Sequence, residues 1–336
     1  MNRESTLSIA LRAFLFSFFF LIEPAAARAA EAPRALAPEV EAFIEEMVQK
    51  HQFEAPALRR LFAQVKPRPA IVKAMSAPST ARPWHEFRGR YLEPQRINGG
   101  VAFWREHAAI IGKASREFGV PEEIIVATIG VETFYGRHTG NFRVLDALAT
   151  LAFHFPPRAE LFRSELEHYL LLLRETGLDA SLRGSYAGAI GIPQFLPSSY
   201  RRHAVDFDGD GRKDLINSVA DAIGSVANYY RNFGWRPGEV IAVPAEAGAG
   251  IDALLEAGIK PEHKVAELRK LGVVPSAPVE EGAQAALIVA EAVTGPRYWL
   301  GLNNFYVITR YNRSVNYALT VWELAQALRA LVKPGS

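Results

Sequence analysis

The chain has 336 residues and no cysteine, with 38 lysines and arginines against 36 aspartates and glutamates. Without cysteine it has no disulfide bond, thiolate nucleophile, cysteine-ligated metal or lipid-modified cysteine. A formal net charge of +2 without a basic stripe argues against a nucleic-acid partner. Because 49% of the residues are hydrophobic, the chain can bury the core of one large domain or of two to three smaller lobes.

Residues 1–29 are predicted to be a secretory signal peptide. Arg3 and Arg12 precede an apolar run at residues 13–22, and the small-residue segment "AAARAA" offers a cleavage site at residues 27–29. The apolar run is short for a helix that spans a bilayer, so an uncleaved anchor is the less favoured alternative. We expect a mature protein that is exported to the periplasm, soluble and without a lipid anchor.

Apolar residues recur at helical spacing along most of the chain up to residue 237. The segments expected to be helical are 38–64, 101–119, 121–136, 143–155, 158–177 and 218–233. The proline-broken segment 64–84 and the glycine-rich segment 184–197 are expected to be loops. This pattern predicts an N-terminal helical lobe at residues 30–104 and a helical core at residues 105–237.

The pattern changes after residue 237. Short apolar pieces at 239–245 and 285–292 alternate with Gly and Pro turns and with a short helical segment at 265–272. We interpret residues 238–300 as a small α/β lobe. Residues 301–336 are expected to return to the core as a strand at 304–312 followed by a helix at 314–332. The predicted fold class is mainly α (α+β), with the strand-containing lobe inserted before the C-terminal helix.

The segment "IGVETFYGRHTG" places Glu132 on an apolar helical stripe. At 100° per residue, Glu132 lies beside Ile125 and Ile129. If this stripe faces the core, the loss of hydration raises the pKa of the carboxyl group, and a protonated glutamate can act as a general acid. The alternative is a structural glutamate that pairs with Arg137 or Arg143 or reaches solvent.

A glycine-rich block at residues 184–200, "GSYAGAIGIPQFLPSSY", is a second candidate for the site. Its glycines allow the backbone to approach a ligand closely. Ser185 and Gln194 would then offer polar contacts in an apolar wall, which suits a sugar chain. A structural loop packed on the core explains the same block equally well.

A third block, residues 304–317, brings aromatic and amide side chains together. Its members of interest are Tyr306, Tyr311, Asn312 and Tyr317. Aromatic rings stack on the C–H faces of sugars, so this combination is typical of saccharide grooves. Tyrosines taken one at a time are more often part of a core.

Five segments together resemble the B-type lytic murein transglycosylases. They are "VPEEIIVATIGVETFYGR", "LDALATLAF", "GSYAGAIGIPQFLPSSY", "DAIGSVANYYRNFGW" and "FYVITRYNRSVNYA", and they occur in the order that the family shows. The resemblance implies a lysozyme-like fold and a single catalytic acid/base, Glu132. It also implies substrate contacts from Ser185, Gln194, Tyr229, Tyr311, Asn312 and Tyr317. Where the family can show a groove-lining tyrosine this chain has Phe87, which keeps the ring without the hydroxyl.

The reaction that the resemblance implies needs one carboxyl group. An ordinary glycosidase uses two carboxylates, and the nearest second candidate, Asp146, is better explained as a first-turn helix residue. In the implied reaction Glu132 protonates the oxygen between N-acetylmuramic acid and N-acetylglucosamine in peptidoglycan. Its carboxylate then deprotonates the muramyl C6 hydroxyl, which attacks C1 of its own ring. The product is a 1,6-anhydromuramyl end, formed without water and without a cofactor.

The segment "DFDGDGRKDLIN" has the spacing of an EF-hand-type calcium loop. Counted from Asp206, the loop positions 1, 3, 5, 6, 7 and 9 are held by Asp206, Asp208, Asp210, Gly211, the carbonyl of Arg212 and Asp214. Position 12, usually glutamate, is Asn217, so we expect Asp221 to supply the last ligand. A solvated, aspartate-rich turn is the alternative. Bound calcium would have a structural role.

Three other functions remain open at this point: a lysozyme-like hydrolase, a non-catalytic peptidoglycan-binding protein, and an extracytoplasmic calcium-binding structural protein. The last leaves the three groove blocks unexplained. The expected partners are peptidoglycan glycan strands and proteins of cell-wall synthesis or division, and the chain is expected to be a monomer. Because few residues follow Val332, we expect no wall-binding module of the kind that some family members append.

Overall fold

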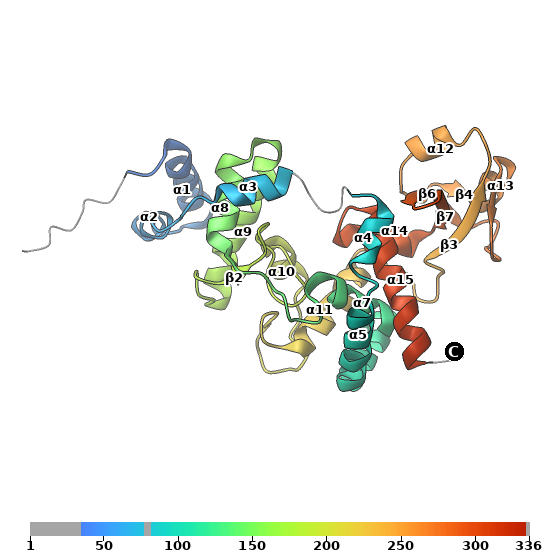
Figure 1. Ribbon diagram of the computed structural model, residues 1–336. Helices are drawn as coiled ribbons and strands as arrows, with labels where there is room; N and C mark the ends of the chain where they lie inside the picture. Colours follow the sequence, from blue (N-terminus) through green and yellow to red (C-terminus); the bar gives the residue numbers. More distant parts are fainter. Residues whose placement is uncertain (1–34, 77–81, 334–336) are drawn as a thin grey trace, which may run out of the picture.

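The computed structural model describes residues 35–76 and 82–333, and helices dominate it (Figure 1). The expected signal peptide lies outside the described residues. The elements of the first two thirds are α1 (Pro38–His51), α2 (Ala55–Phe62), α3 (Pro69–Ser76), α4 (Trp84–Gly89), α5 (Pro94–Glu106), α6 (Ala108–Phe118), α7 (Glu122–Thr133), β1 (Phe142–Arg143), α8 (Val144–His154), the 3-10 helix η2 (Pro156–Arg158), α9 (Ala159–Thr176), β2 (Arg183–Gly184), α10 (Pro197–His203) and α11 (Val219–Asn232).

Several predicted helix boundaries differ from the structure. The segment predicted as one helix at 38–64 forms α1 and α2, because Gln52 adopts a left-handed conformation at φ 55° and ends α1. The segment at 101–119 is likewise divided between α5 and α6, since His107 leaves helical geometry. The predicted loop at 64–84 contains α3, whose Ile71 is fully buried. Residues 77–81 lie outside the described chain.

The helices pack in two groups (Figure 1). In one group α3 packs on α8, and α8 packs on α9; in the other, α7 is surrounded by α5, α6, α11 and the C-terminal helix α15 (Val315–Val332). Both α4 and α5 contact α15. Residues 84–106 are therefore packed with the helices around α7 and with the C-terminal helix, which divides the N-terminal residues differently from the predicted lobe at 30–104.

The small lobe is built on a five-stranded antiparallel sheet with the order β4-β6-β7-β3-β5. Its elements are β3 (Ala242–Ala247), α12 (Asp252–Glu256), β4 (His263–Lys264), α13 (Val265–Lys270), β5 (Val273–Pro275), β6 (Gln284–Ala292) and β7 (Gly295–Gly301). Val265, Leu268 and Leu300 belong to a second hydrophobic core under this sheet. The structure confirms that a strand-containing lobe precedes the C-terminal helix.

The strand predicted at 304–312 is wrong: this segment is the helix α14 (Asn303–Tyr311). Its aromatic and β-branched residues favour a strand locally, but strand propensity depends strongly on tertiary surroundings. Phe305 and Ile308 are both fully buried, and their spacing of three suits a helix. The buried Asn304 also anchors the helix, since its side chain accepts from the Arg236 amide at 2.9 Å and donates to the Arg236 carbonyl at 2.7 Å.

Within the described residues, no helix combines the length and the apolar character that crossing a membrane requires.

Candidate active site

Glu132 lies in the last turn of α7, which is almost entirely enclosed by other helices. Ile124, Ile125 and Ile129 are all at most 1% exposed. Such a continuous apolar surface fixes the helix in the middle of the core. Glu132 itself remains partly exposed at the end of the helix. The predicted stripe therefore does face inward, and the carboxylate sits where the buried helix meets the surface.

The carboxyl group of Glu132 is held in an environment that favours its protonated form. Burial among protein atoms raises its pKa to about 7, and a hydrogen bond from the Tyr317 hydroxyl, 2.6 Å from Oε1, opposes this rise. In residues 35–76 and 82–333, no Lys, Arg or His nitrogen lies within 4.0 Å of it. Arg143 contacts Asp146, and Arg137 lies over the Phe134 ring. The ion-paired alternative for Glu132 is therefore not what the structure shows.

The chain turns sharply after Glu132 in a conformation that is costly for side-chain-bearing residues. Phe134 and Tyr135 have φ of 52° and 61°, and Gly136 follows at 83°. Left-handed geometry costs roughly 1–2 kcal/mol for each non-glycine residue, so tertiary contacts must hold the turn. The Thr133 hydroxyl provides one by donating to the Ile192 carbonyl at 2.8 Å. This bond ties the end of α7 to the glycine-rich block.

Arg96 of α5 makes a second contact with the end of α7, which no sequence pattern had indicated. Its guanidinium donates to the Gly130 carbonyl and lies over the rings of Tyr91 and Phe134, with centroids 5.0 and 4.7 Å away. Loss of hydration lowers the pKa of Arg96. Arg96 thus fixes both the helix end that carries Glu132 and the ring of Tyr91.

A cluster of tyrosines lies behind the carboxyl group. The rings of Tyr311 and Tyr317 are stacked with centroids 6.3 Å apart, and Tyr311 also packs on Tyr229 at 4.8 Å and Tyr230 at 5.5 Å. Tyr229 donates to the Arg310 carbonyl at 2.6 Å. The structure brings Tyr229, Tyr311 and Tyr317 together as predicted. Tyr229 and Tyr317 are at most 6% exposed, so their rings lie mostly inside the wall of the site and offer little surface to a ligand.

The polar residues predicted for the groove differ in their exposure and in the hydrogen bonds that their side chains already make. The Ser185 hydroxyl accepts from the amides of Ala187 and Ala189, at 3.2 and 3.0 Å, and stays partly exposed. Gln194, at φ 53°, donates its amide nitrogen to the carbonyls of Thr139 and Gly191. No donor among the described residues bonds to its side-chain oxygen, which can accept from a ligand. Asn312 is exposed directly after α14.

Phe87 is not a groove residue. Its ring is 1% exposed and packs on Tyr91 with the centroids 4.9 Å apart. Tyr91 is instead the partly exposed aromatic residue from this region. Burial raises the pKa of Tyr91; the charges of Glu132 and Tyr186 raise it further, and those of Arg96 and Arg90 oppose the rise. The sequence patterns did not point to Tyr91 or Tyr186, although Tyr91 lies four residues after Phe87 and Tyr186 directly follows Ser185.

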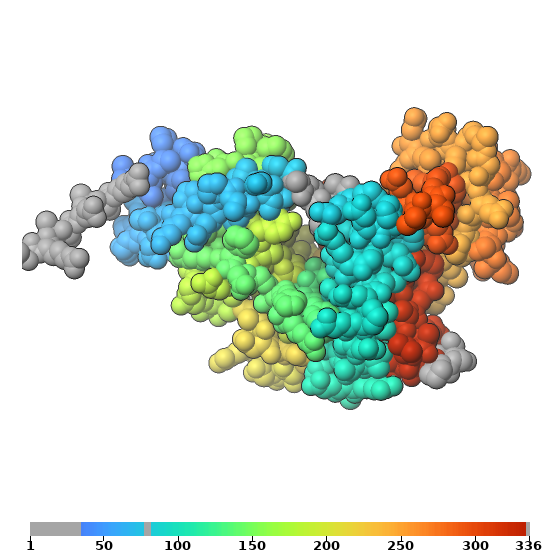
Figure 2. Space-filling view, in the orientation of Figure 1, coloured from blue at the N-terminus to red at the C-terminus, as the bar shows by residue number. Residues whose placement is uncertain are grey.

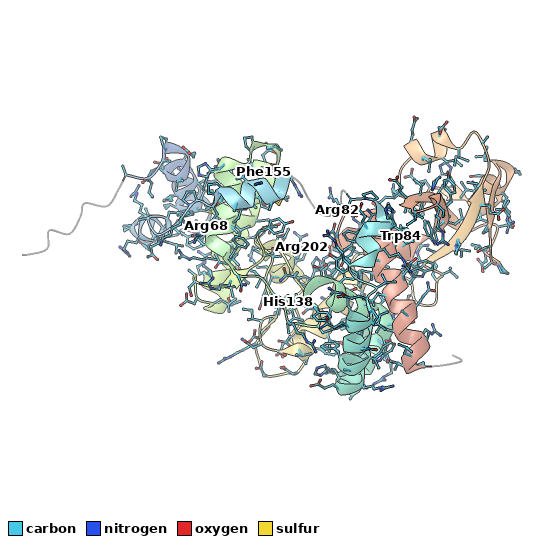
Figure 3. The ribbon with its side chains drawn as sticks, in the orientation of Figure 1. Arg68, Arg82, Trp84, His138, Phe155 and Arg202 are labelled. Carbon is cyan, nitrogen blue, oxygen red and sulfur yellow. The ribbon has the colours of Figure 1, made fainter. Side chains whose placement is uncertain are left out.

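The site lies between the two groups of helices. The space-filling view is hollowed between the segment that carries α3 and the segment that carries α4 and α5 (Figure 2). His138, two residues beyond the left-handed turn, and Arg202 of α10 are labelled in this central region (Figure 3). Burial raises the pKa of Tyr229 above its ordinary value, and the charge of Glu132 raises it further, whereas the charges of Arg310, Arg313 and Arg202 oppose the rise.

Asp146, the nearest second carboxyl group in the sequence, is engaged in contacts between elements. It lies in the first turn of α8 as predicted and is 2% exposed. Its oxygens are 3.2 Å from Arg68 and 3.6 Å from Arg143, and one accepts from the Lys66 amide at 3.2 Å. A carboxylate with this many partners is committed to joining α8 to the segment before α3.

Known proteins resemble the chain over most of its length. Residues 35–326 match the family described as Transglycosylase SLT domain. Membrane-bound lytic murein transglycosylase B of Escherichia coli (strain K12) is 43% identical over 302 residues, which are 87% of this chain and 82% of the relative. The chain belongs to the transglycosylase SLT family.

Two solved structures of related proteins share the fold. Escherichia coli lytic transglycosylase Slt35 in complex with calcium is 41% identical, with a TM-score of 0.78 over 88% of this chain and 94% of that one. SltB3 from Pseudomonas aeruginosa in complex with NAG-anhNAM-pentapeptide is 35% identical, with a TM-score of 0.74 over 87% of this chain and 79% of that one. These similarities confirm the predicted lysozyme-like, mainly helical fold.

The aspartate loop of this family member has the arrangement of a cation site. Carboxylate oxygens of Asp206, Asp208 and Asp210 all lie within 4.8 Å of one another, and all three residues are exposed. Gly209 and Gly211 have φ of 80° and 89°, a conformation that glycine adopts at no steric cost. Oxygen ligands gathered on a flexible loop suit a hard cation such as calcium. The residues present therefore fit that ion.

Asp221 is not placed to be the last ligand that the sequence predicted. It is fully buried in the first turn of α11, and its two oxygens accept from the amides of Phe207 and Asp214, each at 2.7 Å. Burial raises the pKa of Asp221, and these amides oppose the rise. Asp221 holds the two ends of the loop together from inside. The Arg212 amide donates to Asp210 at 2.8 Å, and its side chain is exposed.

Proposed function

We propose that Glu132 is the catalytic acid and base of a lytic murein transglycosylase. As a family member, the chain is an enzyme that cleaves the β-1,4 bond between N-acetylmuramic acid and N-acetylglucosamine in peptidoglycan. The observation that carries the assignment is the position of Glu132 at the end of the buried helix α7, 2.6 Å from the Tyr317 hydroxyl, where burial raises its pKa to about 7. A group that titrates near neutral pH can both give and take a proton during one turnover.

The proposed reaction uses this one group twice. Protonated Glu132 donates its proton to the glycosidic oxygen as the bond to the muramyl C1 breaks. The carboxylate left behind accepts the proton of the muramyl C6 hydroxyl, whose oxygen bonds to C1 and closes a 1,6-anhydro ring. The Tyr317 hydroxyl, 2.6 Å from Oε1, stabilises the carboxylate between the two steps. Asp146 does not share this work because arginines hold it.

The groove residues have distinct proposed roles. Ser185, Gln194 and Asn312 are partly or fully exposed and offer hydrogen bonds to the sugars. Tyr91 replaces Phe87 as the aromatic contact on the α4–α5 side. Tyr229 and Tyr311 form the apolar wall, and Tyr317 orients Glu132. Sugar faces stack on such rings while their hydroxyl groups bond to the polar residues.

The test is digestion of purified murein followed by mass spectrometry of the fragments. We expect anhydromuramyl products, each lighter by one water than the hydrolytic product. Fragments with an ordinary reducing end would refute the transglycosylase reaction and favour a lysozyme-like hydrolase. Binding to murein without soluble fragments would favour a non-catalytic wall-binding protein.

Glu132→Gln should remove the activity in the same assay. Amide for carboxyl keeps the shape but removes the transferable proton, so we expect a loss of at least about 10²–10⁴-fold in kcat. Glu117→Gln is the matched control, since Glu117 is exposed on α6, and it should retain activity. Retention of most activity by Glu132→Gln would exclude Glu132 as the catalytic group.

We further propose that the aspartate loop binds calcium through Asp206, Asp208 and Asp210, supported by the calcium complex of Slt35 and by the clustered oxygens. The Arg212 carbonyl completes the set at the loop position that the sequence assigns to it. Bound calcium would supply rigidity to the loop and take no part in the proton transfers. Asp221 would hold the loop in the conformation that gathers these ligands.

The proposed location is the periplasm. The supporting observations are the sequence of residues 1–29 and the peptidoglycan substrate of the family. Expression of the full chain followed by separation of periplasm, cytoplasm and membranes tests the location and the cleavage of the signal. Proteins of cell-wall synthesis or division are proposed as partners, and the chain is proposed to act as a monomer.

A further inference from the structure

Two buried hydroxyl groups lie behind the Glu132–Tyr317 pair. The Thr128 and Tyr230 hydroxyls are 2.8 Å apart, and both residues are fully buried. We propose that Thr128 and Tyr230 are positioning residues: they orient the Tyr317 hydroxyl and thereby assist Glu132 in giving and taking its proton. The inference rests on the proposed function, because it takes Glu132 as the group that moves the proton. The hydroxyl groups of Thr128, Tyr230 and Tyr317 are called the hydroxyl row.

The hydroxyl row begins and ends beside one face of α7. Thr128 and Glu132 are four residues apart, so they lie on the same face about one turn, or roughly 6 Å, from each other. Both α11 and α15 pack against α7 (Figure 1). The first helix brings Tyr230 to Thr128, and the second brings Tyr317 to within 2.6 Å of Glu132. Three helices therefore contribute to the polar contacts of one carboxyl group.

Tyr230 and Tyr317 belong to one cluster of rings. Each packs on the ring of Tyr311, with centroids 5.5 and 6.3 Å away. Burial raises the pKa of Tyr230, and hydrogen bonding from the side chains of Thr128 and Tyr317 opposes this rise. The Tyr230 hydroxyl is therefore placed between Thr128 and Tyr317.

Packing alone does not account for these polar atoms. Valine and phenylalanine would fill nearly the same space as Thr128 and Tyr230, and a buried hydroxyl group costs free energy unless it is hydrogen-bonded. The Thr128 hydroxyl can donate to the Ile124 carbonyl, 2.8 Å away, but a carbonyl inside a helix already accepts from the amide four residues later. The fold does not require this bond, so the two hydroxyl groups are available to act on Tyr317.

The hydroxyl row has one complete arrangement for each state of Glu132. A hydroxyl group donates one hydrogen, can also accept, and rotates to suit its partners. When Glu132 is ionised, Tyr317 donates to it, Tyr230 donates to Tyr317, and Thr128 donates to Tyr230. When Glu132 is protonated, the Tyr317 hydrogen can turn to Tyr230, the Tyr230 hydrogen to Thr128, and the Thr128 hydrogen to the Ile124 carbonyl. Bonds in such a chain polarise and strengthen one another.

The titratable groups that face Glu132 are tyrosines from four parts of the chain. Burial raises the pKa of each, and the charge of Glu132 raises it further; they are Tyr91, Tyr229, Tyr230, Tyr311 and Tyr317. The cationic groups act on Tyr91 and Tyr229 at the edge of this set, and they are Arg90, Arg96, Arg202, Arg310 and Arg313. All five tyrosines keep their protons near neutral pH, so a titration in that range reports Glu132.

The first test is the pH profile of Thr128→Val/Tyr230→Phe. Replacing both partners by apolar groups of the same shape leaves neither unpaired, so the variant should fold. Without the hydroxyl row behind it, Tyr317 stabilises the carboxylate less, which raises the pKa of Glu132. Since each further bond strengthens a chain by about 10–30%, we expect the basic limb of kcat/KM on soluble murein strands to move upward by roughly 0.3–0.5 pH unit. We also expect kcat to fall about twofold to fivefold with KM unchanged, because both residues are buried away from the substrate.

The matched control is Thr150→Val/Tyr169→Phe in the other group of helices. Thr150 is a buried threonine whose hydroxyl donates to the Asp146 carbonyl at 2.6 Å, and Tyr169 is a buried tyrosine of α9. This control should keep the wild-type limb and kcat, and Thr128→Ser, which retains the hydroxyl, should keep the limb as well. An unchanged profile in Thr128→Val/Tyr230→Phe would overturn the proposal. An equal shift in the control would also overturn it, because general loosening of the core would then explain the effect.

The second test does not depend on activity. With tyrosine labelled by ¹³C at Cζ, the Tyr230 signal, assigned by its absence from Tyr230→Phe, should move as Glu132 titrates and should stay constant in Glu132→Gln. In Thr128→Val the movement should shrink by about half or more, because the row then lacks its first donor. Tyr229 is the internal reference: its pKa is raised by burial and by the charge of Glu132, while its hydroxyl donates to the Arg310 carbonyl at 2.6 Å. Its signal should move equally in both proteins.

The outcomes separate this inference from the proposed function. A Tyr230 signal that ignores Glu132, or that moves as much in Thr128→Val as in the wild type, would overturn the hydroxyl row even if anhydro products form. Absence of anhydro products from the wild-type protein would overturn the proposed function. A Tyr230 signal that still follows Glu132 and loses its movement in Thr128→Val would then support the coupling by itself.

Discussion

The end of α7 and the loop before α11 both present carboxylates, but they surround them differently. Glu132 accepts one hydrogen bond, from Tyr317, and lies among apolar residues. Asp206 accepts from the amides of Gly209, Asp210 and Gly211, and Asp221 accepts from those of Phe207 and Asp214. Burial raises the pKa of both Glu132 and Asp221. At Asp221 the backbone amides oppose this rise, and such donors favour a carboxylate that fixes a loop. The surroundings thus distinguish Glu132, the carboxyl group proposed for catalysis, from Asp206 and Asp221, which hold the loop.

The largest stability change is expected for Asp221→Ala. Removing the side chain leaves the buried amides of Phe207 and Asp214 without acceptors, and each unsatisfied group costs roughly 1–3 kcal/mol. We expect a loss of about 2–4 kcal/mol in the free energy of unfolding, measured by urea titration. Asp252→Ala, at an exposed first-turn position of α12, is the control and should change it by less than about 0.5 kcal/mol. A loss below about 1 kcal/mol would show that Asp221 does not hold the loop.

Replacing the carboxyl group of Glu132 is expected to change the free energy of unfolding in the opposite direction. Because the folded state raises the pKa of Glu132 from 4.5 to about 7, its contribution to stability is complete below pH 4.5 and is lost as the pH rises through 7. Glu132→Gln does not ionise, so it should be more stable than the wild type at pH 8.5 by about 1–3 kcal/mol, discounted for partial exposure. At pH 5 most of this difference should disappear. Urea titrations at both pH values provide the measurement, and a difference independent of pH would contradict a raised pKa.

A smaller effect should follow from Tyr317→Phe. The hydroxyl stabilises the ionised form of Glu132, so its removal should raise the pKa of Glu132 further. We expect the basic limb of the kcat/KM profile to move upward by about one pH unit, since a hydrogen bond to a charged group contributes roughly 1.5–3 kcal/mol. Tyr169→Phe is the control because this buried tyrosine bonds weakly to the Ala180 carbonyl, at 3.5 Å. A drop in rate without any shift of the limb would assign Tyr317 to packing alone.

The smallest effect concerns the cation. Calcium at about ten times its Kd should stabilise the wild type by roughly 1.4 kcal/mol, seen as a rise in Tm. Asp208→Asn/Asp210→Asn should abolish the rise, whereas Asp252→Asn should keep it. Removal of calcium by a chelator should leave kcat nearly unchanged, because the loop takes no part in proton transfer. A large loss of kcat after calcium removal would contradict this prediction and show that the aspartate loop contributes to catalysis.

The sequence carried the parts of the site that lie within single short segments. Glu132 and its apolar neighbours occupy one helix, so their helical phase could be derived from spacing alone. Gln194 and Tyr317 were candidates from the composition of their own short blocks, and the resemblance to a family then assigned them to the substrate groove. The helical segments and the position of the small lobe followed from periodicity, because long amphipathic patterns survive in almost any packing.

Contacts between distant segments could not be derived in the same way. Arg96 reaches the end of α7 from α5, and no local pattern marks a guanidinium that will bind a carbonyl 34 residues away. Spacing placed Asp221 near the loop but could not give the direction of its carboxyl group, which points at amides. The helix α14 was not predicted because local propensity favours a strand at residues 304–312. The contacts that anchor the helix, between Asn304 and the backbone of Arg236, come from a distant segment.

The left-handed turn at Phe134 and Tyr135 has a consequence for the order in which parts of the chain fold. A strained turn forms only when its supports are present, and here they come from Arg96 on one side of the sequence and Ile192 on the other. We therefore expect the surroundings of Glu132 to become ordered late in folding. Pulse-labelled hydrogen exchange during refolding would show this as late protection of the His138 amide, which donates to the Thr133 carbonyl at 2.9 Å; early protection would contradict it. A chain folding after export would thus acquire its lytic activity only as its last contacts close.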